Sequence, residues 1–262
     1  MTYPFGPRLN RLPLAWLVAL AVFADDKKDA KPPEPPNPIL TVPLGLLAGT
    51  TNVLVLRGQR LKDATNVVLA GLSETVVATI KKRDETKAPD GLTVERAGDQ
   101  LLELELVLPS SAAGRTNLAW IVSGPSGTGR PLLTAAFAPT DLSEAKKPNS
   151  SFHDAPQFTA GQRVRGVLAD PGDVAVFQLE GTVGQTVRAE ITASRLSSTL
   201  DAILTLYDAK GTILASNDDT FGRDPAVTHI LVATGRVFVA VTYANEKAAK
   251  THGYLLRVEV DQ

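Results

Sequence analysis

The chain of 262 residues contains no cysteine, so disulfides, thiolate metal sites and a cysteine nucleophile are excluded. Aromatic residues make up only 5% of it, and its formal net charge is only -1. Because nucleic acids and anionic membranes attract concentrated positive charge, this balance predicts no nucleic-acid partner. What the chain does contain is typical of folded proteins: 44% hydrophobic and 21% charged residues, over a length that suits two domains.

The first residues have the order of a secretory signal peptide. Arg8 and Arg11 supply positive charge, residues 12–23 form an uncharged apolar run, and Ala24 ends a small-residue cleavage motif. A membrane anchor is the alternative, but a bilayer takes about 20 apolar residues, and this run is shorter and holds a proline. We therefore predict a signal peptide over residues 1–24, no membrane span after its removal, and a secreted, periplasmic or cell-surface location.

Strand-like segments follow a proline-rich stretch. Residues 25–38 hold prolines and charges but no large apolar side chain before the final proline, which predicts an extended spacer. Residues 39–139 contain seven short apolar runs separated by turns, among them residues 92–95. In residues 102–106 leucine alternates with glutamate, which is typical of a strand with one face in water. This spacing of short strands predicts a β-sandwich.

A second group of strands follows a polar connection. Residues 140–157 mix acids, bases, prolines and serines with little periodicity, which favours a linker. Residues 158–262 contain eight further strand-like runs with no convincing helix between them, which predicts a jelly-roll-like sandwich. The predicted fold class is therefore all-β, with two β-sandwich domains in tandem.

The first domain, residues 39–139, opens with a feature of immunoglobulin-like domains. Within the stretch from Pro43 to Leu61, Gly58-Gln59-Arg60-Leu61 forms a Gly-x-x-Leu element after an apolar strand. This opening resembles immunoglobulin-like domains of the TIG type, in which such an element closes the first hairpin. The resemblance covers the opening only, and implies an immunoglobulin-like sandwich for this domain.

The second domain contains a hairpin followed by an acidic loop. Two alternating apolar strands flank an Asp-x-x-Gly turn at Asp208, and oxygen-bearing side chains follow directly at Asn217. This stretch resembles the bacterial pre-peptidase C-terminal domain, a small secreted β-sandwich appended to proteases and to many exported proteins. The resemblance covers nearly all of residues 158–262, and its further matching elements are Gly166-Val167-Leu168, Gly172-Asp173, Gly184-Gln185-Thr186-Val187 and Gly235 to Val241.

The resemblance implies a binding module and does not imply proteolysis, although similar domains accompany peptidases. Three positions depart from the family pattern. Ala175 stands where relatives often carry a second acid, Ala202 where they carry a proline, and Phe238 where they carry a tyrosine. The change at Ala175 removes an oxygen ligand, so it weakens any metal role taken over from the family.

Five residues form the candidate metal site of the sequence: Asp201, Asn217, Asp218, Asp219 and Asp224. Calcium takes six to eight oxygen ligands, and loops of this kind supply carboxylate, amide and backbone oxygens. The alternative is turn chemistry, because Asp and Asn side chains also bond nearby backbone amides. Calcium is the one cofactor that the sequence suggests, and both interpretations stay open at this point.

Other motifs give no catalytic site. The glycine-rich stretch 124–130 lacks the lysine, the hydroxyl and the following helix of a phosphate-binding loop. A Gly-x-Ser-x-Gly nucleophile elbow is absent from the sequence. The histidines, His153, His229 and His252, lie far apart without metal-binding spacing, and we expect unrelated surface side chains.

The sequence therefore predicts an exported, non-enzymatic binding or structural module that mediates protein or matrix interactions. Its expected partner is a protein or polysaccharide outside the cytoplasm, and Tyr207, Tyr243 and Tyr254 are candidates for a stacking face. One alternative is a calcium-stabilised module that binds carbohydrate or protein. Another is a metal-assisted hydrolase that uses the same carboxylates, which would need a histidine or a further acid in the cluster.

Overall fold

A computed structural model describes residues 32–244 and 248–262 of the chain. The predicted signal peptide and most of the predicted spacer lie outside these residues. Contacts divide the chain into Met1–Pro33 and Glu34–Gln262, and every element below belongs to the second unit. Across the part that the structure describes, no helix has the length and apolar character needed to cross a membrane.

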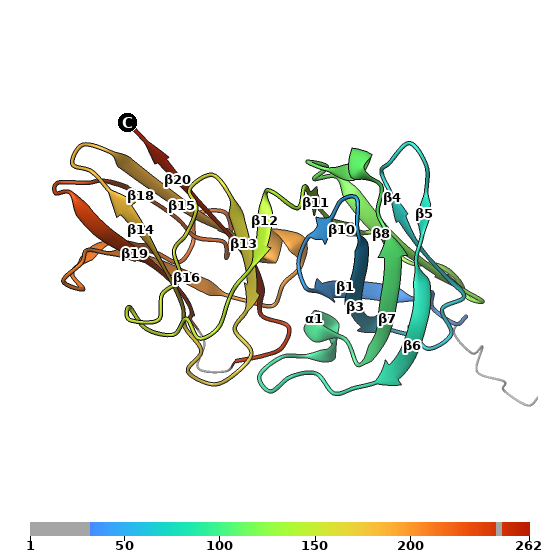
Figure 1. Ribbon diagram of the computed structural model, residues 1–262. Coiled ribbons are helices and arrows are strands. Elements are labelled where there is room, and N and C mark those ends of the chain that lie inside the picture. The colour runs from blue at the N-terminus through green and yellow to red at the C-terminus, as the bar shows by residue number, and fades with distance from the viewer. Residues whose placement is uncertain (1–31, 245–247) are drawn as a thin grey trace, which may run out of the picture. The chain divides into compact units, whose positions relative to one another are not determined.

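The predicted all-β fold is confirmed, and the first half of the unit forms two facing groups of antiparallel strands (Figure 1). One sheet has the order β1-β3-β7-β6, and the other has the order β10-β8-β4-β5 with β9 beside β8. The strands are β1 (Asn37–Val42), β3 (Thr51–Gln59), β4 (Asn66–Ala70), β5 (Val76–Val77), β6 (Thr79–Glu85), β7 (Gln100–Val107), β8 (Leu118–Gly124), β9 (Gly127–Thr128) and β10 (Leu132–Thr134). A short parallel pair joins β2 (Leu46–Leu47) to β11 (Ala136–Phe137).

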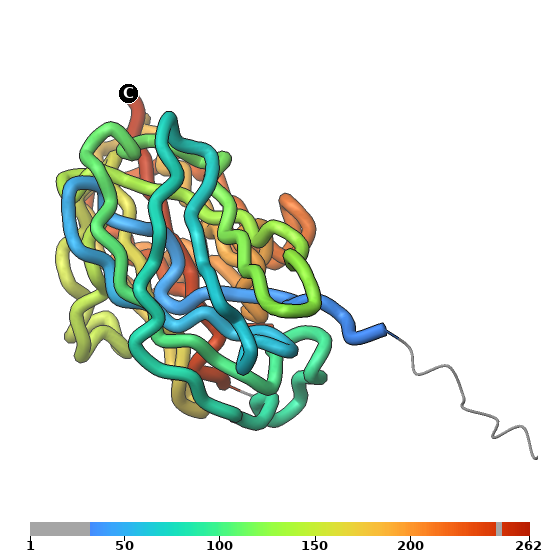
Figure 2. Tube along the Cα trace, turned by 90° about the vertical axis from the view of Figure 1, so that its right-hand side faces the viewer, coloured from blue at the N-terminus to red at the C-terminus, as the bar shows by residue number. Residues whose placement is uncertain are grey.

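Period-two alternation builds the first core. Along β7, Leu102, Leu104 and Leu106 are buried, while the two intervening glutamates are partly exposed, as the sequence predicted. These leucines pack with Leu56 of β3 and the fully buried Trp120 of β8. Figure 2 turns this half of the unit toward the viewer, with residues 66–85 in teal.

The second half forms two further sheets. One has the order β12-β13-β20-β15-β18 and the other β14-β19-β16-β17. The strands are β12 (Leu142–Glu144), β13 (Arg163–Val167), β14 (Ala175–Gly181), β15 (Thr186–Thr192), β16 (Ala202–Tyr207), β17 (Ile213–Asn217), β18 (Ala226–Ile230), β19 (Gly235–Tyr243) and β20 (Gly253–Asp261). Their inward side chains form one core that includes Ile191, Leu204, Val239 and Leu256.

Three segments differ in detail from the sequence prediction. The run at 92–95, predicted as a strand, instead enters the one-turn helix α1 (Val94–Ala97). The helix ends at Gly98, whose φ of 70° favours glycine. Two further short helices are the 3-10 turns η1 (Ser110–Ala112) and η2 (Ser194–Leu196). The predicted spacer contributes Asn37 and Pro38 to β1, and the predicted linker contributes β12, which pairs in parallel with β13.

A third apolar cluster draws residues from both halves of the unit. Leu44 and Phe137 pack there with Leu142 and Leu255. The guanidinium of Arg165 adds a hydrogen bond of 2.8 Å to the backbone oxygen of Gly45. These contacts bring Phe137 next to the outer face of β13, where the guanidinium of Arg163 lies over its ring.

Close backbone contact at Gly58 yields a testable prediction. A Cβ atom at this position would lie 2.1 Å from the backbone oxygen of Asn37, so strands β1 and β3 would have to separate. We expect Gly58→Ala to lower the free energy of unfolding by about 1–3 kcal/mol. Gly124→Ala is the matched control, because its nearest contact would be a looser 3.1 Å. Equal losses in urea unfolding of the two variants would contradict this explanation.

Candidate functional site

The structure brings four of the five predicted metal-site residues to one end of a hairpin. β17 ends at Asn217, which is paired with Leu204 of β16, and Asp201 lies directly before β16. Asp218 and Asp219 follow Asn217 and are exposed. The predicted hairpin with an acidic loop is therefore present.

The fifth residue, Asp224, lies in a different environment. Its side chain is 0% exposed. One carboxylate oxygen accepts hydrogen bonds from the backbone amides of Ala193 at 3.1 Å and Ser194 at 2.6 Å, and the other accepts the amide of Arg195 at 3.1 Å. Asp224 thus holds the start of η2, in the connection between β15 and β16.

Arg195 completes the environment of Asp224. Its Nε atom donates to the carboxylate at 2.9 Å, its Nη2 atom pairs with Glu190 at 2.5 Å, and its guanidinium lies 4.9 Å from the centre of the Phe221 ring. Burial alone would lower the pKa of Arg195, but its hydrogen bonds with Asp224 and Glu190 outweigh burial and raise that pKa. The carboxylate therefore has a structural role.

The side-chain oxygen of Asn217 also takes part in a turn. It accepts a hydrogen bond of 2.6 Å from the hydroxyl of Thr220 and a long one of 3.4 Å from the amide of Ala226. Residues 32–244 and 248–262 contain no group of three or more His, Asp or Glu side chains arranged to hold a metal ion. The calcium site stays a prediction, and any such site would share its Asn217 oxygen with the turn.

The tyrosine side chains do not form one stacking face. Tyr254 is buried in the core, and the hydroxyl of Tyr243 accepts a hydrogen bond of 2.8 Å from the amide of Gly172. Tyr207 packs edge-on against Phe152, with ring centres 5.2 Å apart. These contacts use the rings for packing.

The prediction that His252 lies on the surface was wrong. Its side chain is only 5% exposed, because it packs at the start of β20 beside Tyr243, with ring centres 6.0 Å apart. Burial, together with the positive charges of Arg96 and Arg223, lowers the pKa of His252. His229 also differs from an ordinary surface side chain, since it is half-buried and opposite the core residue Val187.

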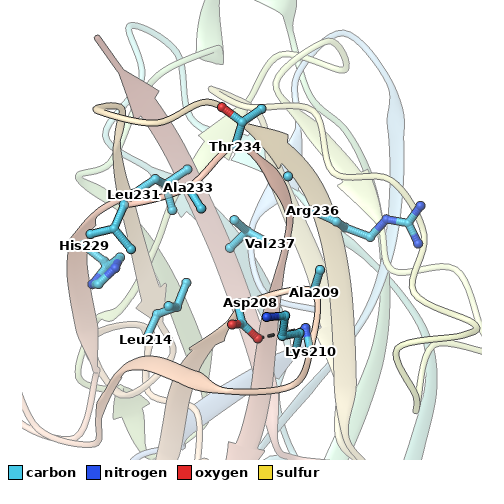
Figure 3. Close-up of a pocket in the computed structure, with 12 residues that line it drawn as sticks. Asp208, Ala209, Lys210, Leu214, His229, Leu231, Ala233, Thr234, Arg236 and Val237 are labelled. Carbon is cyan, nitrogen blue, oxygen red and sulfur yellow. Dashed lines mark hydrogen bonds between the residues drawn. The ribbon is translucent and has the colours of Figure 1, made fainter.

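The sequence did not reveal a cavity at the opposite end of the same hairpin. The cavity has a volume of about 220 Å³ and lies between the β16–β17 turn and the β18–β19 turn (Figure 3). Leu214, Leu231 and Val237 line it with apolar atoms, whereas the side chain of Arg236 points away from it. The arrangement can accept an apolar group.

Hydrogen bonds fix both turns around the cavity. The carboxylate of Asp208 accepts the amides of Lys210 and Thr212, each at 2.8 Å, and the bond with the Thr212 amide is the main cause of its lowered pKa. In the other turn, the hydroxyl of Thr234 accepts the amide of Val183 at 3.0 Å. Hydrogen bonds therefore hold the turns on both sides of the cavity.

Two exposed valines stand beside this cavity. Val232 lies in its wall and is 81% exposed, and Val183 is 63% exposed and bonded to the same turn. The sequence signalled the Asp208 turn through its Asp-x-x-Gly pattern. It gave no sign of these valines as a pair, because the contact between their turns joins residues far apart in the chain.

Comparisons with known proteins give limited similarity. No family model matches the chain. A probable subtilase-type serine protease of Deinococcus radiodurans is 32% identical over 102 residues, which is 38% of this chain and 14% of that protein. The chain thus spans about one seventh of the length of this relative, and the match does not show membership of its family.

Solved structures with similar arrangements are distant. The pre-peptidase C-terminal domain of a Bacillus anthracis collagenase is 11% identical, with a TM-score of 0.35 over 44% of this chain and 99% of that domain. PliG, a periplasmic lysozyme inhibitor of Aeromonas hydrophila, is 14% identical, with a TM-score of 0.32 over 46% of this chain and 98% of that protein. At TM-scores below 0.5, neither comparison supports a statement about function.

The bonds of Asp224 predict a difference between the acidic residues. Asp224→Ala removes four hydrogen bonds from buried or partly buried donors, and we expect it to lower the free energy of unfolding by about 3–5 kcal/mol. The double variant Asp218→Ala, Asp219→Ala removes exposed side chains and should change it by less than about 0.5 kcal/mol. Thermal unfolding in chelator and in millimolar calcium measures both effects.

Calcium separates the two interpretations of this loop. If turn chemistry explains it, the large loss in Asp224→Ala is the same with and without calcium. A calcium-dependent rise of the wild-type midpoint that disappears in the double variant would establish the metal site instead, because an ion bound only by the folded state stabilises it.

Buried His252 predicts a pH dependence of stability. Its pKa in the unfolded chain is about 6.5 and is lower in the folded state, so the unfolded chain takes up the proton first. Stability should therefore fall as pH decreases below about 6.5, by at most about 1.4 kcal/mol per pH unit, until the folded-state pKa is reached.

Urea unfolding between pH 7.5 and pH 5 measures this slope. We expect His252→Gln to reduce it and the loop variant His153→Gln to retain it. An unchanged slope in His252→Gln would show that another group causes the pH dependence.

Proposed function

We propose that the chain is an exported, non-enzymatic binding module that recognises a protein ligand outside the cytoplasm. The observation that carries this proposal is the apolar cavity flanked by Val183 and Val232. Exposed apolar surface around a cavity favours binding, because removing such surface from water contributes about 25 cal/mol per Å². The export part of the proposal rests on the signal-peptide pattern of residues 1–24.

The size and lining of the cavity favour a protein over a polysaccharide. Its volume of about 220 Å³ is below the about 300–1,000 Å³ that small-molecule pockets usually have, and it suits one apolar side chain. No Trp, Tyr or Phe is among the residues that line it, whereas sugar rings commonly stack on such side chains. Asp208 and Lys210 place one negative and one positive charge at the rim, so the apolar lining is the main basis for recognition.

The non-enzymatic part of the proposal rests on how the candidate catalytic groups are used. Asp224, the one fully buried acid of the predicted site, uses its carboxylate in hydrogen bonds to η2 and to Arg195. The relative from Deinococcus radiodurans is a probable serine protease, but the match covers 14% of its length. We therefore propose a binding function for this chain and do not propose proteolysis.

Val232→Asp tests this site without touching the core. A charge at this 81% exposed position should disfavour insertion of an apolar side chain and leave folding intact. We expect selection from a displayed random-peptide library to enrich peptides with an apolar residue that fits the cavity. The enriched peptides should bind Val232→Asp at least about tenfold more weakly, a difference of about 1.4 kcal/mol.

Val53→Asp is the matched control, since Val53 is 65% exposed on β3 of the other sandwich. Binding should be retained in this variant. Peptides that bind Val232→Asp as tightly as the wild type would overturn the assignment of the ligand site.

A further inference from the structure

Two arginines face each other across neighbouring strands on the outer side of a sheet. Arg163 of β13 and Arg257 of β20 are directly paired in the register. Their neighbours Val164 and Leu256 point into the core, so both arginines point to the outer face. Like charges in opposing positions of a sheet are destabilising unless something neutralises them.

Of the acids nearest to this pair, one binds Arg257 and another is engaged with a different arginine. Arg257 forms an ion pair with Glu259 of its own strand. Glu190, which is opposite Arg257 on the third strand, is bound to Arg195 at 2.5 Å. The Nε atom of Arg257 is buried and has no hydrogen-bond partner in the part of the chain that the structure describes.

Arg163 has no acidic partner among the residues that the structure describes. Within residues 32–244 and 248–262 its guanidinium forms no hydrogen bond or ion pair, although Asp141, Glu190 and Glu259 contribute longer-range attraction. The guanidinium lies 5.0 Å from the centre of the Phe137 ring, which supports one of its faces. Burial, followed by the charge of Arg257, lowers the pKa of Arg163.

We propose that Arg163 and Arg257 together bind one small oxyanion group, the chemistry shared by carboxylates, sulfates and phosphates. Guanidinium groups match such anions through forked N–H donors, and two of them can donate to the same group. The Phe137 ring lies against one face of the Arg163 guanidinium, which leaves the N–H groups at the edge of that guanidinium to donate. This site is separate from the apolar cavity and does not depend on the function proposed for it.

The test measures thermal unfolding of the full chain. Acetate, sulfate and phosphate are titrated separately to 20 mM, with chloride added to keep the ionic strength constant. We expect at least one of these anions to raise the unfolding midpoint along a saturating curve, because it binds the folded state only. The comparison among the three identifies the preferred oxyanion.

Three variants decide the outcome. Arg163→Gln and Arg257→Gln should require at least tenfold more anion for the same rise, whereas Arg236→Gln, which removes an exposed arginine paired with Glu180, should respond like the wild type. Equal responses in all four proteins would show a general salt effect and overturn the proposal. So would a wild-type midpoint that none of the three anions raises.

A further comparison without added oxyanion separates binding from packing. If the pair is a binding site, Arg163→Gln relieves repulsion and leaves the midpoint unchanged or raised. A lowered midpoint in this variant, with no loss of the anion response, would assign Arg163 a packing role on Phe137 and overturn the proposal.

Discussion

The second sandwich depends on one buried carboxylate. Asp224 joins two connections that each cross between the sheets: the chain from β15 to β16, which contains η2, and the chain from β17 to β18, in which Asp224 itself lies. A buried ionised carboxylate is stable only when hydrogen bonds and a positive charge replace its water. Three backbone amides and Arg195 supply them, so the two crossings are held in one arrangement.

The contacts of Asp224 also affect the opposite end of the strands that they join. β16, β17 and β18 begin or end near Asp224, and their other ends lead to the Asp208 turn and to the turn before β19. β17 and β18 are edge strands of different sheets, so within the described residues no further strand pairs along their outer edges. The apolar cavity lies between the two hydrogen-bonded turns, which form its walls.

Local patterns were sufficient for much of this fold. The alternation of residues 102–106 and the paired runs around Asp208 predicted strands that the structure contains, and the all-β class followed from them. The sequence also predicted that the acidic loop lies at the end of a hairpin. It did not decide the role of the acidic side chains, because a carboxylate that binds calcium and one that caps a turn have the same sequence pattern.

The remaining features depend on contacts between distant residues. Asp224 and Ser194 are 30 positions apart in the sequence, and Val183 and Thr234 are 51 positions apart. A local sequence pattern therefore cannot predict either contact. His252 follows a polar loop in sequence, but the packing of β20 buries it. Arg163 and Arg257 become neighbours only through the register of β13 and β20.

The most direct test of the proposed function is photo-crosslinking in the source organism of the chain. A photoreactive amino acid is placed at the position of Val232, and in a second strain at the position of Val53, which is similarly exposed. The proposal predicts a discrete crosslinked protein outside the cytoplasm from position 232 and none from position 53. The same product from both positions, or a product from position 53 alone, would contradict a ligand site at the apolar cavity.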